Sequence, residues 1–323
     1  MQQRPLGRSG LAVSRLALGT MTWGRDTDAD DAAAQLKSYL DAGGNLVDTA
    51  DVYGDGDAEA VIGSLLGGLV PREDVLIATK AGVRPGNGRR RDCSRGHLLR
   101  SLDASLRRLG TDYVDLFQVH GYDPATPLEE TMSALDHAVT SGRVRYVGLS
   151  NYSGWQTARA AVWQAAYPGR APVVATQMEY SLLERGVERE VLPACEALGL
   201  GLLPWSPLGR GVLTGKYRNG RPADSRAVSP HFAAFVESYL DPRSSSIVEA
   251  VVTAAGGLGV SPLEVALAWI RDQPGVVAPI LGARTVGQLL GALQAEYLEL
   301  PAEISLALDD VSAIGYAYPE RDD

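Results

Sequence analysis

The sequence predicts an α/β protein built as a single (β/α)8 TIM barrel domain over residues 1–323. Short apolar runs rich in β-branched residues alternate eight times with longer amphipathic or Ala/Leu-rich stretches. Strands that are each followed by a helix are expected to pair in parallel, because parallel neighbours need a crossover connection. A chain of 323 residues also suits such a barrel, which typically takes about 250 residues before insertions.

The apolar runs and the stretches between them give the order of the elements. The expected strands are residues 16–20, 45–48, 75–79, 113–119, 145–149, 173–176, 201–204 and 276–280. The expected helices are residues 29–41, 57–67, 95–108, 128–140, 154–166, 187–198, 246–271 and 285–296. Every predicted strand is therefore followed by a predicted helix.

Two further segments extend this plan. Residues 4–13 predict an N-terminal β-hairpin that turns at Ser9-Gly10 and closes the floor of the barrel. Residues 209–246, which contain three prolines, predict a long excursion after strand seven. Long loops in compact domains are commonly functional lids, so we expect this one to border the active site.

A doubly wound nucleotide-binding sheet is the main alternative fold. It would need a phosphate-binding GxGxxG loop directly after the first strand. The first strand instead continues as residues 18–24, LGTMTWG, which does not match. No linker rich in Pro, Gly or Ser divides the chain into two halves, so one barrel is the better interpretation.

The composition narrows the functional classes. Thirty Lys and Arg against 39 Asp and Glu give a net charge of −9, which disfavours a nucleic-acid-binding protein. No apolar run reaches the roughly 18 residues of a membrane span, and the N-terminus shows no signal-peptide pattern. We therefore expect a cytoplasmic protein without a nucleic-acid or membrane partner.

Metal ligands are sparse in the sequence. Cys93 and Cys195 are isolated, and the four histidines show neither an HxH nor an HExxH spacing. We expect no protein-built metal centre, although a carboxylate-only site stays open. The chemistry is then expected to come from side chains or from an organic cofactor.

Polar side chains stand where predicted strands two, three and four end. Asp48 ends the second strand and Tyr53 follows it, while Lys80 and His120 come directly after the third and fourth strands. Active sites of such barrels lie at the carboxyl ends of the strands. A phenol, with a reference pKa of about 10, becomes a useful acid or base when a lysine ammonium stabilises its phenolate.

Each of these residues alone has a structural explanation, such as a helix cap or a hydrogen-bonded core histidine. All four on three adjacent strand ends favour a catalytic group. We expect Lys80 to tune Tyr53, Asp48 to hold Lys80, and the neutral imidazole of His120 to orient a carbonyl oxygen.

Four segments in the expected order carry a resemblance over essentially the whole chain. They are residues 44–54 (GNLVDTADVYG, followed by Glu59 and Gly63), 101–120, 142–151 and 204–217. Together they resemble the aldo-keto reductase family. The resemblance implies that the family's catalytic tetrad falls on Asp48, Tyr53, Lys80 and His120. It also implies a nicotinamide cofactor, usually NADPH, bound across the barrel mouth.

The resemblance also implies cofactor contacts. Ser150, Asn151 and Gln177 match positions that hydrogen-bond the nicotinamide carboxamide, and Trp205 matches the ring that stacks on the nicotinamide. Arg284 would suit the 2′-phosphate of NADPH. The other cofactor positions implied are Thr20, Met21, Asp48, Ser206, Pro207, Leu208, Gly209, Lys216, Arg226, Gly282 and Gln288.

The chain departs from the family pattern after Gln288. Family members often carry a polar pair there that contacts the adenine, whereas this chain has Gly291-Ala292. Neither residue offers a side-chain hydrogen bond. The departure predicts weaker adenine contacts for NADPH and NADH alike.

Two functions of different classes follow. The first is NADPH-dependent reduction of an aldehyde or ketone to an alcohol, with Tyr53 as general acid and a pocket completed by Trp23, His120 and Tyr122. The alternative is a cofactor-binding regulatory subunit resembling potassium-channel β subunits. Those relatives carry Asn at the position of His120, which favours the enzyme. A metal-dependent hydrolase lacks the histidine cluster it would need. The sequence leaves the carbonyl substrate and the oligomeric state open.

Overall fold

The computed structural model describes all residues except 84–89, 223–227, 229–232 and 316–323. Eight parallel strands are ordered β10-β3-β4-β5-β6-β7-β8-β9. A bridge between Leu202 and Val276, just before β10, brings the two edge strands together and closes the barrel. The strands are β3 (Ala17–Gly19), β4 (Leu46–Asp48), β5 (Leu76–Ala81), β6 (Val114–Val119), β7 (Val144–Ser150), β8 (Val173–Glu179), β9 (Gly201–Trp205) and β10 (Ile280–Gly282).

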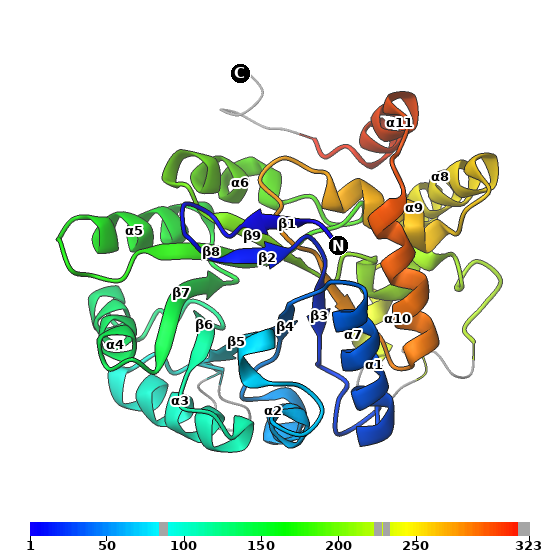
Figure 1. The fold of residues 1–323 in the computed structure, drawn as a ribbon. Helices are drawn as coiled ribbons and strands as arrows, with labels where there is room; N and C mark the ends of the chain where they lie inside the picture. The colour runs from blue at the N-terminus through cyan, green and yellow to red at the C-terminus, as the bar shows by residue number, and fades with distance from the viewer. Residues whose placement is uncertain (84–89, 223–227, 229–232, 316–323) are drawn as a thin grey trace.

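Helices surround these strands, as Figure 1 shows. The α-helices are α1 (Ala29–Asp41), α2 (Asp57–Leu65), α3 (Arg95–Leu109), α4 (Leu128–Thr140), α5 (Gly154–Ala165), α6 (Val187–Leu198), α7 (Ala233–Glu237), α8 (Pro242–Leu258), α9 (Pro262–Arg271), α10 (Val286–Leu293) and α11 (Ala302–Ser312). The 3-10 turns are η1 (Tyr53–Gly56), η2 (Arg72–Asp74), η3 (Gly209–Thr214) and η5 (Gln294–Tyr297). The (β/α)8 TIM barrel predicted from the sequence is confirmed.

The predicted N-terminal hairpin is present and closes the floor. Strands β1 (Gln3–Pro5) and β2 (Ala12–Ser14) pair antiparallel, with Gln3 opposite Ser14. Their connection carries apolar side chains that pack against the inner residues of the barrel strands. Figure 1 shows the hairpin lying across one end of the barrel.

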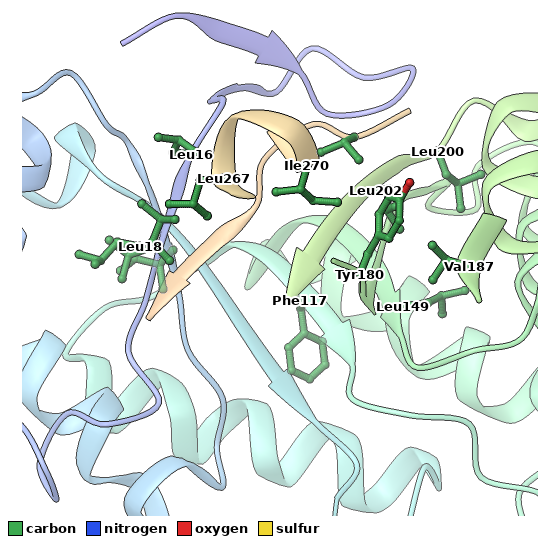
Figure 2. Close-up of a cluster of buried hydrophobic side chains, with 14 of the residues drawn as sticks. Leu16, Leu18, Phe117, Leu149, Tyr180, Val187, Leu200, Leu202, Leu267 and Ile270 are labelled. Atoms are coloured by element: carbon green, nitrogen blue, oxygen red, sulfur yellow. The ribbon is translucent and has the colours of Figure 1, made fainter. Parts of the chain in front are cut away.

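The main apolar core lies between the strands and the helices. In Figure 2, Leu267 and Ile270 of α9 extend toward Leu16 and Leu18 on one side and Leu202 on the other. All five side chains are buried. Burying one leucine or isoleucine side chain stabilises a fold by about 1.5–3 kcal/mol, so this layer holds the ring of helices to the barrel.

The predicted helix over residues 246–271 is wrong as one helix. Helix α8 ends at Leu258, because Gly259 adopts a left-handed conformation with φ of 69° and caps its carbonyls. Ser261 then caps α9 in a box with Glu264, and Pro262 occupies the first helical turn. The two axes bend by 102°. Glycine after a helix and proline at a helix start are the expected signals for this break.

Strand eight was predicted too early, over residues 276–280. Only Ile280–Gly282 form β10, while Val276 makes an isolated bridge. Val276 bridges to β9 and β10 pairs with β3, and Pro279 between them has no N–H to donate to either neighbour. Helix α11 was not predicted, and the excursion of residues 209–246 contains η3, α7 and the start of α8.

No single described helix is long and apolar enough to cross a membrane; only the bent pair α8 and α9 passes that test by length and composition.

Candidate active site

A lysine buried at the barrel mouth holds three oxygen partners. The Nζ of Lys80, at the end of β5, lies 2.7 Å from Asp48 Oδ2, 2.7 Å from the Thr49 carbonyl oxygen and 3.4 Å from the Tyr53 hydroxyl. Lys80 is 0% exposed and Asp48 is 3% exposed. The three N–H donors of the ammonium are therefore all assigned.

The short β4 strand and the turn after it bring these groups together. Asp48 pairs in register with Ala78 of β5, and the Asp51 N–H donates to the Lys80 carbonyl at 3.0 Å. The turn η1 then begins at Tyr53 itself. Gly56 in this turn has a φ of 103°, and a Cβ there would lie 2.8 Å from the Arg108 side chain. Glycine is favoured there because L side chains rarely adopt this backbone conformation, and a larger residue would also displace the Arg108 side chain.

Asp48 is held from the opposite side of the barrel. The Gln177 side-chain amide, at the end of β8, donates to Asp48 Oδ1 at 2.8 Å. Each oxygen of this buried carboxylate thus has a partner, one a cation and one an amide. Breaking such a pair by removing one partner is strongly destabilising, since it leaves an uncompensated buried charge.

Burial and charge act in opposite directions on the Tyr53 phenol. Burial raises the pKa of Tyr53, while the adjacent Lys80 ammonium lowers it and the Asp48 carboxylate raises it again. Burial lowers the pKa of Lys80, but the charges of Asp48 and Tyr53 outweigh burial, so that this pKa stands above its ordinary value. Lys80 therefore stays charged, and the phenol keeps its proton at neutral pH.

His120 lies beside the phenol as a neutral imidazole. The two rings meet edge to face, with centroids 6.0 Å apart and planes at 80°. Burial lowers the pKa of His120 to about 3, and the positive charges of Lys80 and Arg91 contribute. Its Nδ1 atom is buried and has no hydrogen-bond partner among the described residues. The ring can act as a neutral donor but not as a cation.

A cavity of about 560 Å³ opens from this group across the barrel mouth. Tyr53, His120, Arg284 and Gln288 are all among the residues that line it. The predicted cofactor-binding residues among its lining are Thr20, Met21, Asp48, Ser150, Asn151, Gln177, Trp205, Ser206, Pro207, Leu208, Lys216, Gly282, Arg284 and Gln288.

The other predicted site residues lie elsewhere. Gly209 does not line the cavity and instead packs its backbone close to Leu183. Arg226 lies outside the described residues. Trp23 was predicted to line the substrate pocket, but it is 0% exposed and donates its indole N–H to Gln35 of α1, so it is a core residue.

Tyr122 also falls outside the cavity lining. Its ring packs edge to face against Tyr152 at 5.4 Å and against Trp155 at 5.9 Å. Tyr122 therefore packs against the start of α5 and a residue just before it. Only Tyr53 and His120 of the predicted substrate-pocket residues line the cavity.

Two residues that the sequence did not indicate also line the cavity. Phe235 of α7 stacks on Trp205, with centroids 6.3 Å apart and planes at 15°. Arg210 lies over the Phe235 ring and forms two hydrogen bonds to Glu179, at 2.8 and 2.7 Å. The ion pair thus joins the excursion to the end of β8. Arg210 stands inside the recognised 204–217 segment, which could have indicated it, whereas no local pattern indicates Phe235.

Asp51 is a further titratable residue behind the tetrad that was not predicted. Burial and the neighbouring Glu59 raise the pKa of its carboxyl group to about 7. The charge of Asp51 in turn raises the pKa of Tyr53. Ionisation of Asp51 is therefore coupled to the proton on the phenol.

The lining residues suit a nicotinamide dinucleotide. Trp205 offers an aromatic ring to the cavity, and its indole N–H donates to Asn151 Oδ1 at 3.1 Å. Asn151, whose φ is 55°, donates in turn to the His120 carbonyl at 3.0 Å. The aromatic ring suits a flat heteroaromatic ring, and the amide and hydroxyl groups near it suit a carboxamide. The basic side chains of Lys216 and Arg284 suit the phosphates joined to it.

The cavity lining has fewer hydrogen-bonding groups at Ala292. Ala292 borders the cavity without a polar side-chain atom, as the sequence departure indicated. No group of three or more His, Cys, Asp or Glu residues that could hold a metal occurs in the part of the chain that the structure describes.

Fold and site together define a barrel oxidoreductase, and comparison with known proteins gives the family. The model of the aldo/keto reductase family matches residues 15–313, and the chain belongs to this family. It is 38% identical to "Uncharacterized oxidoreductase YrpG" of Bacillus subtilis (strain 168), in an alignment of 321 positions that covers 96% of this chain and 96% of that protein.

Relatives with other names are nearly as similar. The chain is 37% identical to a "Probable voltage-gated potassium channel subunit beta" of Oryza sativa subsp. japonica, covering 99% of this chain and 98% of that protein. It is 34% identical to "Protein tas" of Escherichia coli (strain K12), covering 99% of both. Family membership supports an oxidoreductase, while the relatives' names differ in function.

Proposed function

We propose that this protein reduces an aldehyde or ketone to the alcohol with NADPH, in a reversible reaction in which Tyr53 is the general acid. The observation that carries the proposal is the contact of the Tyr53 hydroxyl with the buried Lys80–Asp48 pair at the wall of the cavity. A cytoplasmic location and a small-molecule carbonyl substrate are part of the proposal.

The proton comes from the phenol. Tyr53 faces the cavity and keeps its proton at neutral pH, so its hydroxyl can donate to a carbonyl oxygen. As the proton leaves, the Lys80 ammonium at 3.4 Å stabilises the phenolate. Asp48 keeps Lys80 in place through its 2.7 Å ion pair. General acid catalysis of this kind typically contributes about 10²–10⁴-fold to the rate.

The second donor to the carbonyl oxygen is His120. Its imidazole is neutral, because burial holds its pKa at about 3. A neutral ring that donates from Nε2 can align the carbonyl oxygen with the Tyr53 hydroxyl without adding a charge. Two preorganised donors at one oxygen stabilise the negative charge that develops there.

The cofactor site would use the rest of the lining. Trp205 would hold the nicotinamide ring, Ser150 and Gln177 would contact its carboxamide, and Arg284 would contact the 2′-phosphate. When bound there, NADPH supplies a hydride to the carbonyl carbon. Gln177 already donates its amide hydrogen to Asp48, so its Oε1 atom is the part that serves the carboxamide.

A cofactor-binding regulatory subunit is the second candidate, because relatives named as potassium channel β subunits are 36–37% identical over 99% of this chain. Both the enzyme and the regulatory subunit would bind the cofactor in this cavity, but only the enzyme would turn over a carbonyl substrate. All four residues of the implied catalytic tetrad, including His120, are present in this chain, which favours the enzyme.

A panel of aldehydes and ketones, followed by loss of the reduced-nicotinamide absorbance with NADPH and NADH in parallel, tests the proposal. We expect turnover of at least one aldehyde, faster with NADPH than with NADH at equal subsaturating concentration. Binding of NADPH without turnover of any carbonyl or alcohol would favour the regulatory subunit. Failure to bind either cofactor would reject both candidates.

A further inference from the structure

Three of the four tetrad residues have their hydrogen bonds completed by direct partners. Lys80 uses its three donors on Asp48, Thr49 and Tyr53, and Gln177 serves the second oxygen of Asp48. The exception is His120, whose buried Nδ1 has no partner among the described residues. Burying such an atom without a hydrogen-bond partner costs free energy.

A second unpaired group lies on the same strand. Gln118 of β6 is 0% exposed, and both polar atoms of its side chain, Oε1 and Nε2, are buried without a partner among the described residues. In register, Gln118 stands directly opposite Lys80 on one side and Gly148 on the other. Since the donors of Lys80 are already used, Gln118 does not serve the lysine.

Gln118 and His120 share one face of β6. The backbone ladder continues past the strand, as the His120 N–H donates to the Ala81 carbonyl at 2.8 Å. Residues two apart on a strand point to the same side and stand about 7 Å apart. Gly148 has no side chain opposite them, and a Cβ there would lie only 3.1 Å from Gln118 Cγ and 3.4 Å from its Oε1. The amide therefore lies across Gly148 on the inner face of the barrel, the face that His120 shares two residues further along the chain.

We infer that Gln118 is a positioning residue, which acts through one buried water on His120 Nδ1. The water accepts from the Gln118 amide and donates to Nδ1, so that Nδ1 carries no hydrogen and Nε2–H is left to face the cavity. Buried waters typically join two to four polar groups that would otherwise be unpaired. This inference rests on the proposed function, in which Nε2–H orients the carbonyl oxygen.

The tautomer of His120 is the direct measurement. Long-range ¹H–¹⁵N spectra of the ¹⁵N-histidine-labelled protein, with His120 assigned by the His120→Asn variant, distinguish the two neutral forms. We expect a single Nε2–H tautomer in the wild type from pH 5 to 8. An Nδ1–H tautomer in the wild type would overturn the inference without any variant of Gln118.

The variant Gln118→Met keeps a linear side chain and removes both polar atoms. We expect it to give a mixture of the two His120 tautomers and to lower kcat about five- to tenfold, the factor that one ordinary net hydrogen bond predicts, with unchanged NADPH affinity. A single Nε2–H tautomer in this variant would overturn the inference.

Thr176→Val is the matched control. Thr176 is also fully buried, lies on a barrel strand and has an unpaired hydroxyl among the described residues, but it lines no part of the cavity. We expect it to change neither the tautomer nor kcat, and a change equal to that of Gln118→Met would make the effect one of packing. The spectra need no substrate, so a protein that reduces no carbonyl would reject the proposed function and leave the tautomer measurement valid.

Discussion

The two ends of the barrel both contain buried side chains, but of opposite kinds. At the floor, Leu6, Leu11 and Val13 of the N-terminal hairpin segment pack against apolar residues that point inward from the strands. At the mouth, Lys80 and Asp48 are buried as an ion pair. Apolar burial stabilises the fold directly, whereas a buried charge costs free energy unless every partner is in place. The floor should therefore govern stability, and the mouth should govern chemistry.

The largest expected effect is at the mouth. Tyr53→Phe keeps the ring and removes only the hydroxyl, and Lys80 retains Asp48 and Thr49 as partners. We expect carbonyl reduction to fall by about 10²–10⁴-fold, with NADPH binding and stability nearly unchanged. Steady-state kinetics, cofactor titration and thermal melting measure the three. Retention of more than about a tenth of the activity would reject Tyr53 as the proton donor.

Lys80→Met, although at the mouth, should change both stability and chemistry. Loss of the ammonium leaves Asp48 as an uncompensated buried charge, so we expect a loss of about 3–5 kcal/mol in the free energy of unfolding. The pKa of Tyr53 should also rise, because the Lys80 charge that lowers it is gone. The rate of alcohol oxidation, which rises with pH as Tyr53 ionises, should therefore rise at a higher pH in the variant. If the rate rises at the same pH in the variant and the wild type, Lys80 does not tune the pKa of the phenol.

Leu6→Ala tests the floor. Leu6 is fully buried, and truncating a buried leucine typically costs about 2–5 kcal/mol of stability. We expect that loss in urea unfolding, with kcat unchanged under conditions where the variant stays folded. Leu306→Ala, at a side chain that is 63% exposed, is the control and should change stability by less than about 0.5 kcal/mol. A tenfold fall in kcat for Leu6→Ala would show that the two ends are coupled.

Arg284→Ala sharpens the comparison within the mouth by testing a cofactor contact instead of the proton donor. A charge-assisted hydrogen bond to the 2′-phosphate is worth about 1.5–3 kcal/mol, which is roughly a 10- to 150-fold loss in NADPH affinity. NADH affinity should hardly change, and titration of both cofactors by tryptophan fluorescence decides it. Arg159→Ala, whose side chain pairs with Glu129 outside the cavity, is the control. If Arg284→Ala weakens both cofactors alike, or neither, Lys216 or Arg226 becomes the better candidate for the phosphate contact.

The smallest expected effect is a pH dependence near neutrality. Asp51 titrates near pH 7, and its charge raises the pKa of Tyr53, so alcohol oxidation by the wild type should fall behind that of Asp51→Asn above pH 7. Below about pH 5, where Asp51 is protonated, the two rates should meet. A coupling of one pKa unit or less limits the difference to about tenfold. His120, with a pKa of about 3, adds no limb in this range. Identical profiles at all pH values would remove Asp51 from the site.

The sequence by itself determined the barrel, its hairpin floor and the meeting of the tetrad. Periodicity and the short strand runs are local properties, and parallel strands place all their carboxyl ends at one mouth. Asp48, Lys80 and Tyr53 therefore come together from spacing alone, as their contacts show. The sequence also contains the signals for the break after α8, namely Gly259 and Pro262. The apolar periodicity continues across them, which led to the prediction of one helix.

Only the tertiary structure decided what surrounds that group. Trp23 stands directly after a strand, where the sequence predicted a pocket wall, yet the packing of α1 buries it completely. Phe235 reaches Trp205 from about 30 residues along the chain, and no local pattern encodes that contact. Gln118 looks like any residue of an apolar strand until the structure shows that its amide atoms and the Nδ1 atom of His120 are buried without a hydrogen-bond partner among the described residues. Burial and hydrogen-bond pairing depend on residues distant in sequence, so the sequence alone does not reveal them.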